Sequence, residues 1–111
     1  MRGKFELRKS LNGQYHFKLK ASTGELLLSS EMYSSKIGAE YGIESVKKYA
    51  SLEASYERRI SMSWQAYFVL KAANEEPIGT SAMYCSASDR DEGIESVKLN
   101  APNAQLIDMT V

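Results

Sequence analysis

The chain has 111 residues, of which 43% are hydrophobic and 25% charged, and this length and composition fit one globular domain with one core. Its 14 basic and 14 acidic side chains cancel, so no large field of one sign draws the whole molecule towards nucleic acid or anionic lipid. Cys85 is the single cysteine, which excludes an intrachain disulfide and a zinc site built from thiolates.

Three strands are expected at the start of the chain. Phe5–Arg8 alternates apolar and polar residues, and Tyr15–Ala21 alternates cleanly, which predicts two strands that each bury one face. Asn12 and Gly13 between them both tolerate positive φ and predict a tight hairpin turn. Leu26–Leu28 begins a third strand, but three successive leucines support either register. We therefore predict an antiparallel meander.

A helix is expected after the meander. Its apolar residues recur at helical spacing and form a stripe that would lie on the sheet: Ala39, Gly42, Ile43, Val46 and Ala50. Ser34 or Ser35 is expected to cap its N-terminus. A glycine inside a helix costs about 1 kcal/mol relative to alanine. We interpret Gly42 as a site where a side chain would hold the helix away from the sheet or from a second helix.

From Tyr56 the pattern starts again, with an offset of 51 residues. The stretch Gly42–Lys47 recurs as Gly93–Lys98, and Phe5–Ala50 aligns with Tyr56–Ala101 without a gap. Self-similarity over a whole unit indicates duplication. We predict a single domain over residues 1–111, made of two repeats at 5–55 and 56–111 that share one core.

The second repeat departs from the first in its turns. Ser63-Trp64 stands where the first repeat has Asn12-Gly13. Pro77 has no N–H, which predicts that the third strand of this repeat starts late or lies at an edge of the sheet. Ser86 is expected to cap the second helix.

A last strand is predicted over Ala104–Thr110, after Asn100-Ala101-Pro102 ends the second helix. Under the offset its counterpart is Glu53–Arg59, which overlaps the first strand of the second repeat. We therefore expect one central strand to serve both repeats. We also expect the last strand to pair near the first repeat.

Three motifs together resemble the YegP-like family of small bacterial proteins of unknown function, in its duplicated form: Phe17-x-Leu19-Lys20-Ala21, Ser30-Glu31-Met32-Tyr33-x-Ser35-Lys36 and Gly42-Ile43-x-Ser45-Val46-Lys47. The resemblance covers nearly the whole chain, and the second repeat departs from it at Ala82, Ala87 and the Asn74-Glu75 turn. It implies an α+β fold in which two β-β-β-α-β units build a single antiparallel sheet with exchanged terminal strands. We expect both helices on one face of that sheet.

The residues that chemistry needs are sparse. His16 is the single histidine and lies in a strand beside lysines, so a catalytic triad or a histidine metal site has no evident partners. Cys85 corresponds to Ser34 under the offset, which favours a small structural residue. The glycines lie singly and form no phosphate-binding loop. We expect no enzymatic activity, no cofactor and no metal.

Two functions of a non-enzymatic kind remain open. The first is an interaction module that presents its open sheet face or an edge strand to a protein partner. The second is weak binding of nucleic acid through a basic and aromatic strip on that face. Both would use the outward residues of the two second strands: His16, Lys18 and Lys20 in the first repeat, Tyr67, Val69 and Lys71 in the second.

The charge of the two halves differs, although the total is zero. Residues 1–55 carry nine basic and six acidic side chains, and residues 56–111 carry five and eight. Two interpretations of this asymmetry are open: sequence drift on solvated faces after duplication, or a charged patch with a function. No apolar run approaches the roughly 20 residues that span a bilayer. We expect a cytoplasmic monomer with internal pseudo-symmetry.

Overall fold

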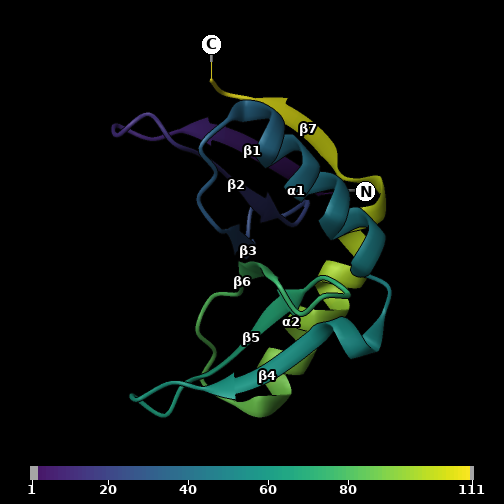
Figure 1. The fold of residues 1–111 in the computed structure, drawn as a ribbon. Helices are drawn as coiled ribbons and strands as arrows, with labels where there is room; N and C mark the ends of the chain where they lie inside the picture. Colours follow the sequence, from purple (N-terminus) through teal and green to yellow (C-terminus); the bar gives the residue numbers. More distant parts are fainter. Residues whose placement is uncertain (1–2, 111) are drawn as a thin grey trace.

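The computed structural model describes residues 3–110 (Figure 1). Seven strands and two α-helices follow one another in the order β1 (Lys4–Lys9), β2 (Tyr15–Lys20), β3 (Leu26–Ser30), α1 (Lys36–Tyr49), β4 (Tyr56–Ile60), β5 (Ala66–Lys71), β6 (Pro77–Thr80), α2 (Ala87–Asn100) and β7 (Gln105–Asp108). A single turn of 3₁₀-helix precedes β4 at Glu53–Ser55, and another precedes β7 at Ala101–Asn103. Each element expected from the sequence is present. Neither α1 nor α2 is long and apolar enough to cross a membrane.

All seven strands form one sheet, in the order β4-β5-β6-β3-β2-β1-β7. Each half of the chain contributes a meander, and the two meanders join where β3 pairs with β6, with Ser29 opposite Thr80. The α+β class is confirmed. The sheet is mixed and not wholly antiparallel as expected, because β7 runs parallel to β1.

The direction of β7 follows from the place where the chain enters the sheet. The main-chain N–H of Gln105 donates to the carbonyl of Gly3 at 3.1 Å, beside the start of β1. Leu106 then lies opposite Phe5, and Asp108 opposite Leu7. A segment that enters at the end where β1 begins runs in the same direction as β1. The expected pairing of the last strand with the first repeat is confirmed.

β4 lies at one edge of the sheet, so the expectation of one central strand that serves both repeats is wrong. It pairs with β5 through a hairpin, with Tyr56 opposite Leu70, and this hairpin holds it on the side away from β6. Under the offset of 51 residues β4 is the counterpart of β1. The two differ because β1 has β7 outside it, whereas no described strand lies outside β4.

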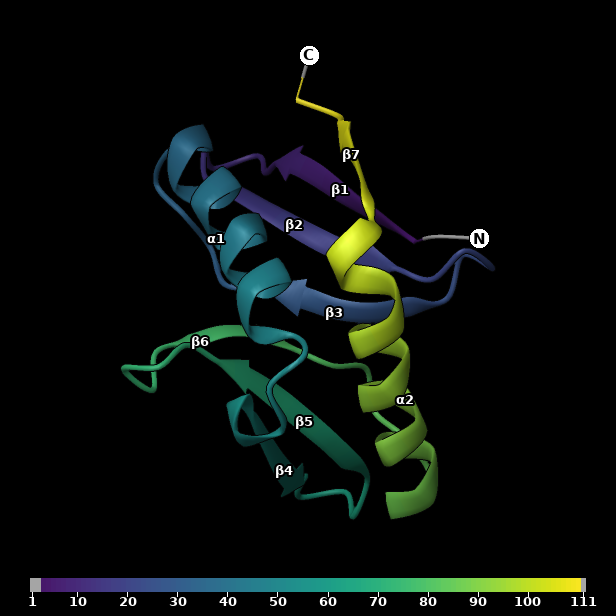
Figure 2. The ribbon, with the colours of Figure 1, turned by 90° about the vertical axis from the view of Figure 1, so that its right-hand side faces the viewer.

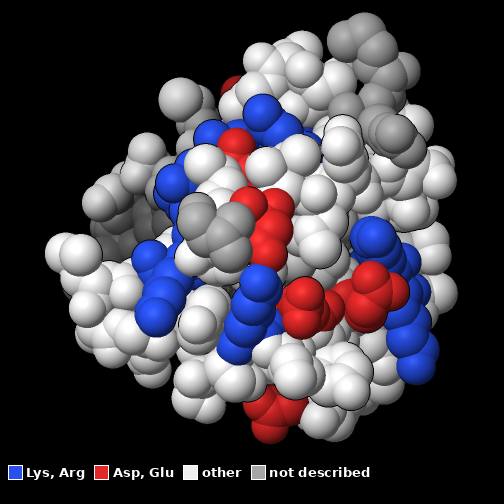
Figure 3. Space-filling model, turned by 90° about the horizontal axis from the view of Figure 1, so that it is seen from above, with Lys and Arg blue, Asp and Glu red and all other residues white. Residues whose placement is uncertain are grey.

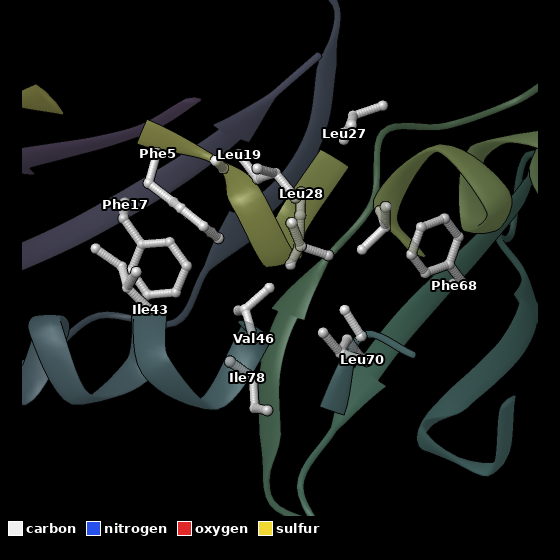
Figure 4. Close-up of a cluster of buried hydrophobic side chains, with 14 of the residues drawn as sticks. Phe5, Phe17, Leu19, Leu27, Leu28, Ile43, Val46, Phe68, Leu70 and Ile78 are labelled. Carbon is white, nitrogen blue, oxygen red and sulfur yellow. The ribbon is translucent and has the colours of Figure 1, made fainter. Parts of the chain in front are cut away.

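Both helices cover the same face of the sheet, as Figure 2 shows. Each begins at the expected serine: Ser35 Oγ accepts from the N–H of Gly38, and Ser86 Oγ from the N–H of Asp89, both at 3.0 Å. One buried apolar cluster joins the two halves, and it includes all eight residues expected in a common core: Phe17, Leu19, Ile43, Val46, Phe68, Leu70, Ile94 and Val97. Figure 4 shows several of these side chains between the sheet and the helices.

The helix glycines make room for tyrosine rings. The side chains nearest to each glycine come from these tyrosines and, for Gly42, from the sheet, and not from the second helix. A Cβ on Gly93 would lie 2.7 Å from Tyr84 Cζ, and a Cβ on Gly42 would lie 2.8 Å from Tyr33 Cζ. The Gly42 position would also meet Phe17 Cε2 of the sheet, at 2.9 Å. Each tyrosine precedes its helix in sequence and lies under it.

Strand pairing decides two further expectations, the register of β3 and the place of Pro77 in the sheet. Leu28 lies opposite Leu19, while Leu26 lies opposite Lys20, so the register of β3 shifts between these pairs and both Leu27 and Leu28 are buried. This shift explains why three successive leucines fitted either register. The expectation for Pro77 is wrong, because β6 is an inner strand that begins with this residue. A first residue tolerates a missing N–H.

Candidate functional site

The six residues predicted to bind a partner lie on the face of the sheet that the helices leave uncovered. They form two groups, because β3 and β6 separate β2 from β5. Three strand spacings of roughly 4.8 Å place the groups about 14 Å apart. A continuous row crosses this face, made by the pairs Glu6–Lys18, Lys18–Ser29, Ser29–Thr80, Thr80–Val69 and Val69–Glu57.

The two candidate lysines at equivalent positions of the repeats are each paired with a glutamate. Lys20 Nζ lies 3.2 Å from Glu6 Oε1, and Lys71 forms an ion pair with Glu57, the offset counterpart of Glu6. An arginine completes each group: Arg8 reaches Glu6 at 2.7 Å, and Arg59 reaches Glu57 at 2.5 Å. We call these the Glu6 cluster and the Glu57 cluster. Each cluster keeps a net positive charge, because a single carboxylate faces at least two cations.

The clusters shift the pKa of both glutamates downwards. The hydrogen bond from Arg59, followed by that from Lys71, holds the pKa of Glu57 at about 2, below its ordinary 4.5. The hydrogen bond from Arg8 lowers the pKa of Glu6, although burial of this carboxylate opposes the shift. Both glutamates therefore carry a full negative charge at neutral pH, opposite the cations beside them.

The remaining four candidates differ in what they offer a partner. Val69 is only 4% exposed, so it has little surface to offer, and Tyr67 and His16 are half-buried. Burial lowers the pKa of His16, and the charges of Lys18 and Arg8 lower it further, so the ring is neutral at physiological pH. Lys18 makes no ion pair with any residue in the described part of the chain. It is the least compensated cation among the six.

Basic and acidic side chains are also mixed elsewhere on the surface. On the side seen in Figure 3 they lie interspersed and form no large patch of one sign. A phosphate backbone is attracted by accumulated positive charge. The side seen in Figure 3 offers no such accumulation, whereas the two clusters on the sheet keep an excess of positive charge.

The hairpin tips carry large apolar side chains that the sequence analysis did not select. Leu11 in the β1–β2 loop and its offset counterpart Met62 in the β4–β5 loop are fully exposed, and Trp64 is 86% exposed. In Figure 1 both loops project at the left, on the side away from the helices. The tips therefore flank the uncovered face.

Both loops share one backbone path, which differs from the tight turn expected at Asn12-Gly13. The N–H of Ser10 donates to the carbonyl of Gln14, and the N–H of Gly13 donates to that of Ser10; in the second loop Ser61, Gln65 and Trp64 repeat both bonds. Gly13 has φ +85. Asn12 accepts the N–H of Gln14 through its side chain instead of adopting positive φ.

Trp64 keeps the left-handed conformation that Gly13 adopts, with φ 64. A side chain in this region costs about 1–3 kcal/mol, because its Cβ crowds the backbone. In the other pair of equivalent loops, Glu75 stands at the position of Gly24 and has φ 67. The signal that could have found Trp64 in the sequence is a bulky aromatic residue at the position of a turn glycine.

Comparison with known proteins gives one family. The family described as a domain of unknown function (DUF1508) matches residues 10–57 and again residues 63–108. A UPF0339 protein of Acinetobacter baylyi is 49% identical over 110 residues, which cover 99% of each chain. The UPF0339 protein YegP of Escherichia coli K12 is 46% identical over 110 residues, 99% of this chain and 100% of the relative.

Two solved structures share the fold. The solution structure of the E. coli protein yegP, described as of unknown function, superposes with a TM-score of 0.94 at 46% identity and covers 99% of this chain and 95% of that chain. A UPF0339 protein of Shewanella oneidensis gives a TM-score of 0.93 at 47% identity, covering 99% and 93%. The chain belongs to the DUF1508 family, whose matched members are uncharacterised UPF0339 and YegP proteins.

Proposed function

We propose that this protein is a non-enzymatic interaction module of the cytoplasm, which binds a partner protein through the β4–β5 hairpin tip and the uncovered sheet face next to it. The observation that carries the proposal is Trp64. This residue is exposed in water, and it is held in a conformation that glycine adopts at lower cost in the equivalent loop. Strained residues concentrate at functional sites.

Magnitudes support a binding role for this side chain. An aromatic side chain buries about 150–250 Å² when it enters an apolar site. At about 25 cal/mol per Å², burial of about 200 Å² of indole contributes roughly 5 kcal/mol before the costs of association. This gain exceeds the local strain of about 1–3 kcal/mol. Tryptophan is also enriched among residues that dominate binding energy.

Weak binding of nucleic acid is the second candidate function. Lys20 and its counterpart Lys71 each pair with a glutamate on the same face of the sheet. Each glutamate offsets only one of the cations in its cluster, so the positive charge that remains can contact phosphate and supports this second candidate. A partner protein can use the same clusters through hydrogen bonds to both signs of charge, which suits a polar rim around an aromatic anchor.

We also infer that the chain is a tandem of two equivalent units. Two observations support this: the family match occurs twice, and the two clusters repeat residue for residue at the offset, with Glu6, Arg8 and Lys20 answered by Glu57, Arg59 and Lys71. Trp64 then marks a difference between the units. One hairpin retained the turn glycine, and the other exchanged it for an exposed aromatic side chain.

Trp64→Gly tests the proposal, with Glu75→Gly as its matched control. Both substitutions restore a glycine at a left-handed position, so both relieve strain, but only Trp64→Gly removes the indole. Immobilised protein is exposed to a bacterial cytoplasmic lysate, and bound proteins are compared by mass spectrometry. We expect a partner retained by the native protein and by Glu75→Gly and lost with Trp64→Gly. Equal retention by all three proteins contradicts the proposal.

Trp64 is the single tryptophan, so its fluorescence provides an independent measurement. An indole that is exposed in the free protein and buried by a partner should shift its emission to shorter wavelength when the captured partner is added. Unchanged emission in a saturated complex would place the contact elsewhere.

A further inference from the structure

The two outer strands of the meanders are related by the offset, but one of them carries an additional strand. β7 pairs along β1, whereas no strand in residues 3–110 pairs along the outer side of β4. An outer edge presents main-chain N–H and C=O groups that an extended peptide can bind. The way in which β7 is held on β1 therefore shows how a strand binds to this type of edge.

β7 is held by three kinds of contact. Its main chain pairs with β1, including a 2.8 Å bond from the N–H of Met109 to the carbonyl of Leu7. Leu106 lines a hollow of about 330 Å³ together with Ile37 and Tyr41 of α1. Asp108 pairs with Lys36 at the start of α1, at 2.6 Å. Thus β1 supplies the backbone template, and α1 selects the side chains that face it.

The equivalent place beside β4 contains a hollow without a strand. It has about 600 Å³ and is lined by four residues of α2: Ser88, Asp91, Glu92 and Glu95. They are the offset counterparts of four residues that line the β7 hollow, namely Ile37, Glu40, Tyr41 and Glu44. Arg58 of β4 bonds to Asp91 at 3.0 Å, so the hollow adjoins the edge strand. No described residue stands where Leu106 stands in the other half.

The chemistry of this second hollow differs from that of the first. Ile37 and Tyr41 are replaced by Ser88 and Glu92, so the second lining loses its apolar residues and has three carboxylates where the first has two. Glu92 forms no ion pair with any residue between 3 and 110. The chain's own β7 brings Leu106 and Asp108, which match neither the lining nor its charge, so a second copy is a poor occupant.

We propose that an extended, basic segment of a partner protein adds to the sheet along the outer edge of β4, parallel to it, with a lysine or arginine side chain directed at Glu92 of α2. The inference deepens the proposed function, because it names the chemistry and the conformation of the partner. The segment would run from Tyr56 towards Ile60. It would approach the hairpin tip where Met62 and Trp64 are exposed.

A strand added beside β4 would direct its side chains alternately to α2 and to the uncovered face of the sheet. Successive side chains point to opposite faces, so every second residue of the segment would face α2. A long basic side chain can lay its methylene groups along the stems of the α2 residues and place its charge at Glu92, because Asp91 already pairs with Arg58 and Glu95 with Lys98. Main-chain bonds supply affinity, and the alternate side chains supply specificity.

The probe is a short fluorescent peptide in which lysine alternates with threonine or valine. The same peptide with glutamate in place of lysine is the control. Binding is measured by fluorescence anisotropy at low salt, and the site is mapped from amide shifts in ¹⁵N NMR spectra. We expect the lysine peptide alone to bind, with shifts concentrated in β4 and α2. Equal affinity of both peptides, or shifts confined to the uncovered sheet face, overturns the inference.

Two matched variants test the edge itself. Leu7 offers its carbonyl outwards to β7, so the main-chain groups of its counterpart Arg58 also face outwards. Arg58→Pro removes the outward N–H and the side chain, while Arg58→Ala removes only the side chain. The proline variant should bind the lysine peptide about tenfold more weakly than the alanine variant, the equivalent of one hydrogen bond. Equal affinities contradict strand addition.

Glu92→Lys keeps the test decisive if Arg58→Pro does not fold. Glu92 is a surface residue without an ion pair to the described residues, so charge reversal leaves the fold intact. We expect the lysine peptide to lose about tenfold in affinity and the glutamate peptide to gain. Unchanged affinities for both peptides overturn the inference. That failure is distinct from failure of the proposed function, which depends on capture of a partner through Trp64.

Discussion

Gly93→Ala offers a sharp test of how the helices pack. In an isolated helix the substitution would stabilise by about 1 kcal/mol, because alanine has the higher helix propensity. In this protein the new Cβ would lie 2.7 Å from Tyr84 Cζ and 3.2 Å from Cε2. Overpacking of this kind costs about 1–3 kcal/mol. We therefore expect a net loss of stability of up to about 2 kcal/mol.

The sign of the effect should reverse when the tyrosine ring is absent. In a Tyr84→Ala background the clash is gone and only helix propensity remains, so Gly93→Ala should stabilise by about 1 kcal/mol. The coupling energy between the two sites is then about 1–3 kcal/mol. Urea unfolding of the four proteins of this double-mutant cycle, followed by circular dichroism, measures it.

Two controls distinguish the contribution of the tyrosine ring from that of its hydroxyl group and from that of a contact with the sheet. The Tyr84 hydroxyl is buried without a hydrogen-bond partner among the described residues, so Tyr84→Phe should leave stability unchanged or raise it. Gly42→Ala should cost more than Gly93→Ala, because its Cβ also meets the fully buried Phe17. The packing argument is refuted if Gly93→Ala stabilises the otherwise native protein by about 1 kcal/mol.

Three further predictions concern the core, the last strand and the Glu57 cluster. Ile94 is fully buried, so Ile94→Ala should cost about 2–5 kcal/mol in urea unfolding, and a shift below roughly 0.5 kcal/mol would count against its place in the core. A chain that ends at Pro102 should expose the edge of β1 and associate or unfold in light scattering and thermal melts, whereas a monomer of native stability would contradict the role of β7. The folded pKa of Glu57 is about 2, so its contribution to stability is present above its ordinary pKa of 4.5 and is lost as the pH falls towards 2. Glu57→Gln should therefore lose less stability than the native protein across that interval, and equal losses would show that the ion pairs are not formed.

The elements and the shared core could be predicted from the sequence. Alternation in Tyr15–Ala21 identified β2, helical spacing around Ile43 identified α1, and the offset of 51 residues carried both predictions into the second half. These signals are local, because a side chain's burial is set by the period of its own strand or helix. The candidate residues His16 to Lys20 and Tyr67 to Lys71 were also placed on the uncovered face by alternation alone.

The direction of β7, the edge position of β4 and the charge state of the candidate face were decided by tertiary structure. The direction of β7 depends on where α2 delivers the chain, beside Gly3, and no local pattern encodes that point of entry. Lys20 and Lys71 read as free cations in sequence because their partners, Glu6 and Glu57, lie on neighbouring strands. Trp64 read as a variant turn residue until its backbone angle and its exposure were known. Pairing across strands joins residues that are distant in sequence, so these ion pairs and the unpaired outer edge of β4 exist only once the chain has folded.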